Sequence, residues 1–142
     1  MSGLTLSEIR AAIKTQLRDN IDRQTNVDVD GEGMPAPVLR LYLRQSDPID
    51  YWGTFGSTGI AEVRFDLEID PGGVDQSAVI RLDEYLSVGT GNTSSVIDAL
   101  MSDVTLGSVV QTCRINSSEY DQQNVTATLS LTVVCRKQGA EV

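Results

Sequence analysis

The chain has 142 residues, 40% of them hydrophobic, with a formal net charge of −9 and no histidine. This length suits one domain with an adequate core, whereas the acidic balance argues against a protein that grips nucleic acid, because such proteins carry a basic footprint. The lack of histidine removes Ser-His-Asp and Cys-His catalytic pairs and histidine metal sites. We find neither a signal-peptide pattern nor an apolar run near the ~18 residues of a membrane span. We therefore expect one soluble domain over residues 1–142.

An amphipathic helix is predicted over residues 5–21, where apolar side chains recur at helical spacing. Thr5 or Ser7 can cap its start, and Glu8 completes a capping box with Thr5. Another side of this helix carries a basic stripe at i, i+4 and i+8, made of Arg10, Lys14 and Arg18. Either the stripe is solvated, or it contacts the acids of a neighbouring protein.

Two strands are predicted next, over residues 38–44 and 60–70, because apolar and polar side chains alternate there. Residues 45–59 between them are expected to form a loop. One face of the second strand is apolar and belongs in the core. The opposite face carries four acids against one arginine, the acids being Glu62, Asp66, Glu68 and Asp70. This face is either solvated or turned toward a bore.

The stretch YWGTFGSTG, residues 51–59, places aromatic side chains among glycines. It lacks the Gly-Lys-Ser/Thr sequence and the strand-to-helix setting of a phosphate-binding loop. Its aromatics can fold back as a lid over the sheet. Alternatively they project to bind another protein, since Trp and Tyr are enriched at interfaces. The second hypothesis assigns the contact to Tyr51, Trp52 and Phe55.

The second half of the chain predicts two helices and then two strands. Asp75 can cap the first helix, and Asn92, Thr93 or Ser94 the second. The strands are predicted over 108–116 and 124–136, joined by SSEYDQQ as a hairpin loop. If Ile115 pairs with Val125, Cys135 lies far along the ladder from Cys113, so we expect two core cysteines and no disulfide. The whole predicts an α+β fold, a mainly antiparallel four-stranded sheet with helices packed on one face, in the order α-β-β-α-α-β-β.

Catalytic and metal sites find little support in the sequence. Asp66, Glu68 and Asp70 share one strand face, on which neighbouring acids lie roughly 6.6 Å apart. This separation is within the glycosidase range, but the face offers no sugar-binding cleft. The stretch DVDGEG places acids at the first, third and fifth positions of a calcium loop. The twelfth position, where a bidentate glutamate belongs, is Leu39. We therefore expect no catalytic residue, no metal site, no cofactor, and a protein that is not an enzyme.

One longer stretch carries a resemblance, IRLDEYLSVGTGNTSSVIDALMSDVTLGSVVQTCRI at residues 80–115. It resembles the tail terminator (tail completion) proteins of long-tailed bacteriophages. In that family a helix ending in LD.YL, a Gly/Ser-rich break, a short helix ending AL..D.TLGG and a strand recur in this order. Here the last turn reads DVTLGS.

The resemblance implies a structural protein of the virion tail or neck, assembled in the host cytoplasm. It implies a homo-oligomeric ring of six copies that caps the tail tube, ends its polymerisation and binds the head–tail connector. DNA would pass through the bore without specific binding, and a lining of Glu62, Asp66, Glu68 or Asp70 would repel its phosphates. Another head–tail connector protein of the neck, or a small soluble ligand-binding domain, are the alternatives.

Overall fold

The structure is a computed structural model that describes residues 4–21, 24–54, 57–88 and 95–135. Its nine elements come in the order α-β-β-β-β-α-α-β-β, so two strands were missed by the sequence pattern. The helices are α1 (Leu6–Asn20), α2 (Gln76–Tyr85) and α3 (Val96–Met101). The strands are β1 (Asn26–Asp28), β2 (Val38–Leu43), β3 (Ile49–Thr54), β4 (Ser57–Asp70), β5 (Thr112–Asp121) and β6 (Thr126–Val134).

The sheet is mixed and has six strands, which corrects the predicted four-stranded antiparallel sheet. Its order is β1-β2-β4-β6-β5, with β3 also paired to β4. Only β1 and β2 run parallel; the other neighbours are antiparallel. The α+β class is confirmed. Of the two missed strands, β3 falls in residues 45–59, which were expected to form a loop, and β1 lies in a segment for which no strand was predicted.

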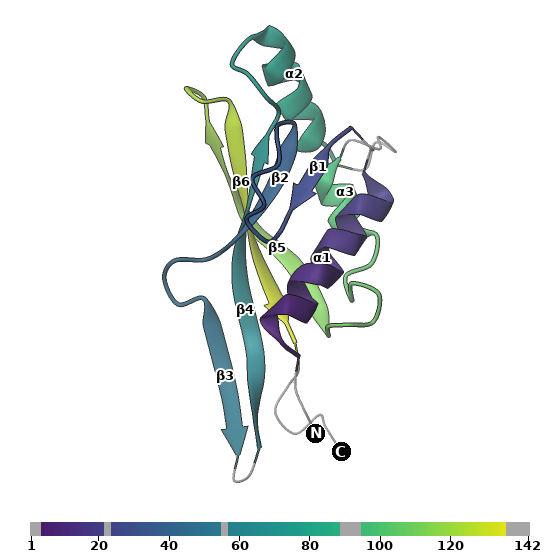
Figure 1. The fold of residues 1–142 in the computed structure, drawn as a ribbon, viewed down its shortest axis with the longest axis vertical. Helices are drawn as coiled ribbons and strands as arrows, with labels where there is room; N and C mark the ends of the chain where they lie inside the picture. Colours follow the sequence, from purple (N-terminus) through teal and green to yellow (C-terminus); the bar gives the residue numbers. More distant parts are fainter. Residues whose placement is uncertain (1–3, 22–23, 55–56, 89–94, 136–142) are drawn as a thin grey trace.

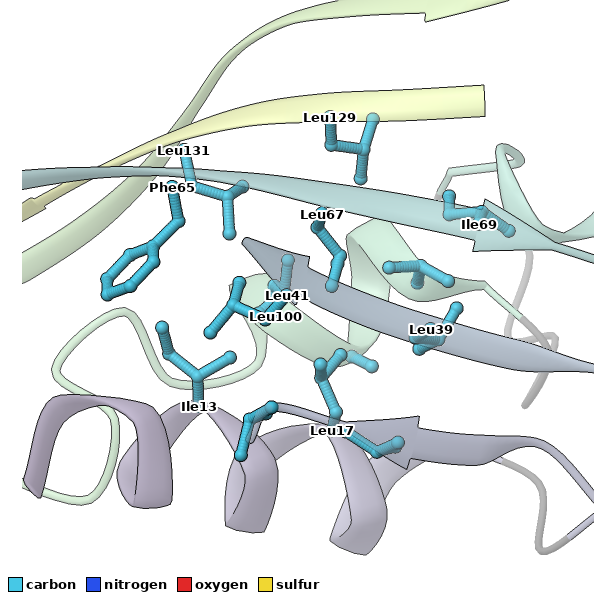
Figure 2. Close-up of a cluster of buried hydrophobic side chains, with 14 of the residues drawn as sticks. Ile13, Leu17, Leu39, Leu41, Phe65, Leu67, Ile69, Leu100, Leu129 and Leu131 are labelled. Atoms are coloured by element: carbon cyan, nitrogen blue, oxygen red, sulfur yellow. The ribbon is translucent and has the colours of Figure 1, made fainter. Parts of the chain in front are cut away.

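The core lies between one face of this sheet and the helices (Figure 1). Ile13 and Leu17 of α1 point at the strands, and side chains of β2, β4 and β6 point back at them (Figure 2). The alternation predicted for β4 is confirmed, because Phe65 and Leu67 are fully buried while the charged residues that alternate with them, Arg64, Asp66 and Glu68, are half-buried. One sheet face is thus the core, and the other is free to carry polar function.

The start of α1 follows the predicted capping box. The Thr5 hydroxyl accepts the backbone N–H of Glu8 at 3.1 Å, and the Glu8 carboxylate accepts the backbone N–H of Thr5 at 3.1 Å. These bonds satisfy two of the donors that a helix start leaves without a partner. Asp75 caps α2 as predicted. The cap of α3 is Ser95, whereas the predicted Asn92, Thr93 and Ser94 lie outside the described residues.

Thr5→Ala should therefore lower the free energy of unfolding by about 1 kcal/mol, because the cap is lost while the core is untouched. Urea denaturation measures this directly. Ser7→Ala is the matched control, since Ser7 is exposed and the capping bond belongs to Thr5. Equal destabilisation by both substitutions would contradict the capping account.

The C-terminal hairpin is shifted from its predicted position, and its register is different: β6 spans Thr126–Val134 where 124–136 was predicted. β5 starts at Thr112 and continues through most of SSEYDQQ to Asp121. Ile115 pairs with Leu131, not Val125, and Cys113 pairs with Val133. Cys135 is therefore only two residues beyond the partner of Cys113, which corrects its predicted distant position.

Both cysteines are nevertheless free and buried, as expected of core cysteines. Burial raises the pKa of the Cys113 thiol to about 11. Burial, with a smaller effect of the Glu62 charge, raises the pKa of Cys135 to about 11 as well. Both thiols thus stay protonated near neutral pH and behave as small apolar side chains.

Candidate functional site

A projecting β-hairpin is the most distinctive surface feature of the molecule. β3 and the first residues of β4 extend beyond the body of the protein (Figure 1). β3 pairs only with β4, and β6 pairs with β4 only from Glu62 onward. Within the described residues, 57–60 therefore pair with β3 alone. A two-stranded hairpin is marginally stable by itself, and its open edges can pair with another chain.

This hairpin contains the aromatic residues predicted to mediate assembly. The segment 51–59 was expected as a loop and is instead mostly strand. Tyr51 is 70% exposed, which shows that this side chain does not form a lid. Trp52 lies in β3 opposite Gly59. Its side chain, like the whole of Phe55, lies outside the described residues.

The root of the hairpin is held by Arg64 of β4. Its guanidinium donates to the Asp50 carboxylate at 2.6 Å and to the Asp47 carbonyl at 3.0 Å. Its backbone N–H donates to the Pro48 carbonyl at 2.7 Å. The hydrogen bond from Arg64 lowers the pKa of Asp50, so this carboxylate stays charged. Both the backbone and the side chain of Arg64 therefore fix the direction in which the hairpin leaves the sheet.

The four acids predicted to face a bore do share the sheet face opposite the core, but most of them are ion-paired. Arg64 contacts Glu62 at 3.1 Å. Glu68 and Asp70 share Arg40, at 3.1 and 3.2 Å. Asp66 alone among the four has no such partner in the described residues. The face is therefore less negative than the sequence of β4 suggested. On the neighbouring β6 it is continued by hydroxyl side chains, those of Thr128, Ser130 and Thr132.

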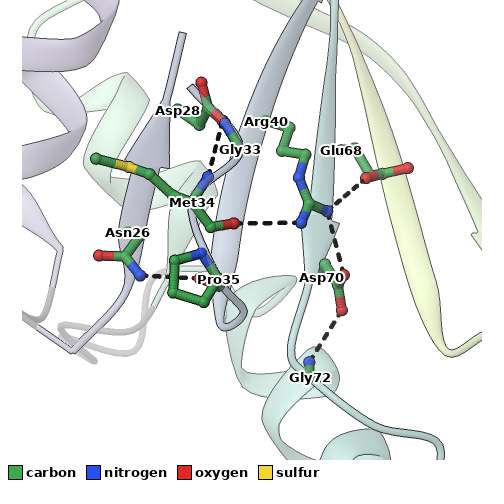
Figure 3. Close-up of polar contacts among 9 residues, drawn as sticks. All are labelled: Asn26, Asp28, Gly33, Met34, Pro35, Arg40, Glu68, Asp70 and Gly72. Carbon is green, nitrogen blue, oxygen red and sulfur yellow. Dashed lines mark hydrogen bonds and ion pairs between the residues drawn. The ribbon is translucent and has the colours of Figure 1, made fainter. Parts of the chain in front are cut away.

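Arg40 also ties the segment after β1 to the sheet. Its guanidinium reaches the Met34 carbonyl at 3.4 Å as well as both acids (Figure 3). Burial would lower the pKa of Arg40, but its bonds to Asp70 and Glu68 raise it instead. The strands β2 and β4 were both predicted, but the ion pairs of Arg40 with Glu68 and Asp70 were not. A cross-strand ion pair depends on the strand register, which the alternation of side chains does not determine.

Arg40→Gln should lower the free energy of unfolding by about 1–2 kcal/mol, because two half-buried carboxylates lose their shared partner. We expect faster proteolysis at residues 31–36 in the same variant. Arg44→Gln is the control, since Arg44 is exposed and its side chain has no partner among the described residues. The account is wrong if both variants unfold at the same urea concentration.

The basic stripe of α1 does not act as a single free surface. The Arg10 guanidinium donates to the Val29 carbonyl at 3.2 Å and lies 6.0 Å from the centre of the Phe65 ring. Lys14 forms an ion pair with Glu32 at 3.6 Å in which both side chains stay partly exposed. Arg18 is exposed and has no partner among the described residues. Only Lys14 and Arg18 therefore remain open to a second molecule.

The calcium-like stretch DVDGEG is organised by one buried carboxylate. Asp28 is 3% exposed and accepts backbone N–H groups from Glu32 and Gly33, both at 2.9 Å, and from Met34 at 3.3 Å. Burial by itself would raise the pKa of Asp28, but the backbone hydrogen bonds outweigh it and lower the pKa. Both carboxylate oxygens face the loop backbone. Within the described residues, no three potential ligands gather to hold a metal ion.

A groove of about 630 Å³ opens beside α1. One wall is the α1 flank and the other is the turn at residues 103–109, and the lining includes Glu8, Ala11, Thr15, Asp19, Asp103 and Val109. Asp103 holds this turn by accepting bonds from Thr105 and from the N–H of Gly107. The sequence pattern did not reveal this groove, because its two walls are about ninety residues apart in the chain.

No protein-family model matches this chain, and no curated protein matches it in sequence. Of the helices in the described part of the chain, none combines the length and apolar character needed to cross a bilayer.

Proposed function

We propose that this protein is a tail terminator of a long-tailed bacteriophage. Six copies of it form a ring that caps the tail tube and stops its polymerisation. The opposite side of the ring binds the head–tail connector. The protein then belongs to the virion neck, is assembled in the host cytoplasm, and has no enzymatic activity.

The projecting β3–β4 hairpin is the observation that carries this proposal. It presents an exposed tyrosine and strand edges that the described part of its own subunit leaves open, as a subunit of an assembly requires. The second support is the resemblance over residues 80–115. These residues contain most of α2, the break, α3, the 103–109 turn and the start of β5, in the order the resemblance implies.

The bore hypothesis is modified by the ion pairs of the sheet face. With Glu62, Glu68 and Asp70 paired to arginines, a bore lined by this face would be weakly rather than strongly acidic. Asp66, with no ion-pair partner among the described residues, and the half-buried Thr128 and Ser130 of β6 would then form its most hydrated part. Such a lining offers DNA no row of free cations, so bound phosphates would not slow its passage.

Polymerisation of the purified tail tube protein tests the proposed function. Added in small amounts, this chain should shorten the tubes and be seen by electron microscopy at one end of each tube. A binding assay against the connector ring then identifies the second face. Binding to the connector without any effect on tube length would favour the other neck protein.

The groove beside α1 is the one feature that favours a small ligand-binding domain. Its volume of about 630 Å³ lies in the range of small-molecule sites. This alternative would be supported if a thermal-shift screen finds a small molecule that raises the melting temperature, and if the chain stays monomeric and does not bind tail tubes. An effect on tube length in the absence of small molecules would reject it.

A further inference from the structure

α1 carries opposite charges on two different flanks. One flank faces β1 and the segment after it, where Arg10 bonds Val29 and Lys14 bonds Glu32. The other flank forms the groove with the 103–109 turn. The groove lining contains Glu8, Asp19 and Asp103 and no cation. A helix with two such flanks has the two different, complementary patches that a head-to-tail contact needs.

Few cationic side chains in the described part of the chain are left without a carboxylate or carbonyl partner, and this limits which residues can hold two copies together. Among the described residues, the arginine and lysine side chains that bond neither a carboxylate nor a carbonyl are Arg18, Arg44 and Arg114. Two copies of a chain with a net charge of −9 repel each other. Contact between copies is therefore favoured where an open cation of one copy meets uncompensated acids of the next.

Arg18 and Lys14 meet this requirement on a single surface. They are one helical turn apart, and the pair between Lys14 and Glu32 is long and partly exposed, so it holds Lys14 weakly. Glu8 and Asp19 are eleven residues apart on α1, or about 16 Å along its axis. The small side chains of Ala11 and Thr15 between them leave room for long aliphatic stems that end in charges.

We propose that Lys14 and Arg18 of one copy dock in the α1 groove of the next copy, with Asp19 and Asp103 as their main acidic partners. This inference rests on the proposed ring and names the contact that closes it. Arg10 is not part of the contact, because it is bonded within its own subunit. When this contact is repeated around the ring, the basic flank of each copy binds one neighbour and the groove of each copy binds the other neighbour.

Two double variants, one that reverses the charge of the flank and one that makes the groove basic, test the contact. The flank variant is Lys14→Glu with Arg18→Glu, and the groove variant is Thr15→Lys with Asp19→Lys. Glu8 and Asp103 are left unchanged because they bond the helix start and the turn. The control is Arg44→Glu with Arg114→Glu, which lowers the net charge by the same amount as the flank variant. Thermal melting confirms that every variant is folded.

Sedimentation velocity over a range of concentrations, at low and high salt, measures the assembly. At low salt each variant alone should assemble about tenfold more weakly than the wild type, and the control should not. Mixing the flank and groove variants should restore assembly, because both kinds of contact in an alternating ring are then complementary. Three results would each overturn this inference without contradicting the proposed ring. They are unimpaired assembly of the flank variant, an equal loss of assembly in the control, and no restored assembly when the two variants are mixed. A wild type that stays monomeric even with tail tubes would overturn both.

Discussion

Asp28→Ala should lower the free energy of unfolding by about 3 kcal/mol, because three backbone N–H groups would lose their charged acceptor at once. Asp28 is almost fully buried and accepts from Glu32, Gly33 and Met34. The segment it organises leads into β2 and supplies the carbonyl that Arg40 binds. Chemical denaturation measures the loss. Asp30→Ala is the matched control, since Asp30 is exposed in the same segment and should change stability by less than about 0.5 kcal/mol.

The same carboxylate predicts a pH dependence with a definite sign. The pKa of Asp28 in the folded protein is below its ordinary value of 3.8. Its contribution to stability is therefore fully present above pH 3.8 and is lost as the pH falls through the lower, folded pKa. The stability difference between the wild type and Asp28→Asn should shrink over that acidic range and stay constant at higher pH. A difference that is unchanged down to the acid transition would contradict the assignment.

The elements with strong sequence periodicity were predictable. The 3.6-residue pattern and the capping box of α1 require no knowledge of the rest of the fold. β4 was predictable because one of its faces is covered by helices and the other is not, which imposes strict alternation. These two elements contribute Ile13, Leu17, Phe65 and Leu67 to the centre of the core.

The parts that project beyond the helix layer were not predictable in this way. Residues 117–121 of β5 are all exposed, and so are Asp50, Tyr51 and Gly53 of β3, so neither stretch has a buried apolar face that alternation could reveal. Ser118 pairs with Leu129 and Tyr120 with Ala127, yet Ser118 and Tyr120 are exposed. The polar sequence SSEYD thus resembles a loop although it is a strand. Because SSEYDQQ was predicted as the hairpin loop, the turn between β5 and β6 was placed too early in the chain. The predicted pairing of Ile115 with Val125 was therefore wrong.

In the candidate site, too, some features were predictable from the sequence and others only from the fold. The composition of residues 51–59 predicted a surface for binding, which stays a prediction, whereas the strand pairing that makes this segment project came only from the fold. The charges on α1 and β4 were visible in the sequence, whereas their partners were not. Arg10 turns to Val29 and Phe65, and Arg40 pairs two of the β4 acids, through contacts between segments whose relative position the sequence pattern leaves open.

Replacing Tyr51 and Trp52 together with alanine should weaken assembly by about thirty-fold or more, while the melting temperature of the isolated subunit stays the same. An interface hot spot contributes 2 kcal/mol or more, which corresponds to about that factor. Tyr51 is 70% exposed, so its removal empties no core space. The register partner of Trp52 is Gly59, and a glycine offers no side chain for a stabilising cross-strand pair.

The experiment compares this double variant with Tyr42→Ala, which removes a 50% exposed tyrosine from β2 in the body of the sheet. Thermal melting of the subunit and the length of tail tubes are measured for both. Lost tube capping with unchanged melting in the double variant, and neither effect in Tyr42→Ala, is the expected result. A subunit that melts earlier would instead mean that the aromatics stabilise their own fold. The hairpin would then be a stabilising extension of the sheet, and the observation that carries the proposed function would be gone.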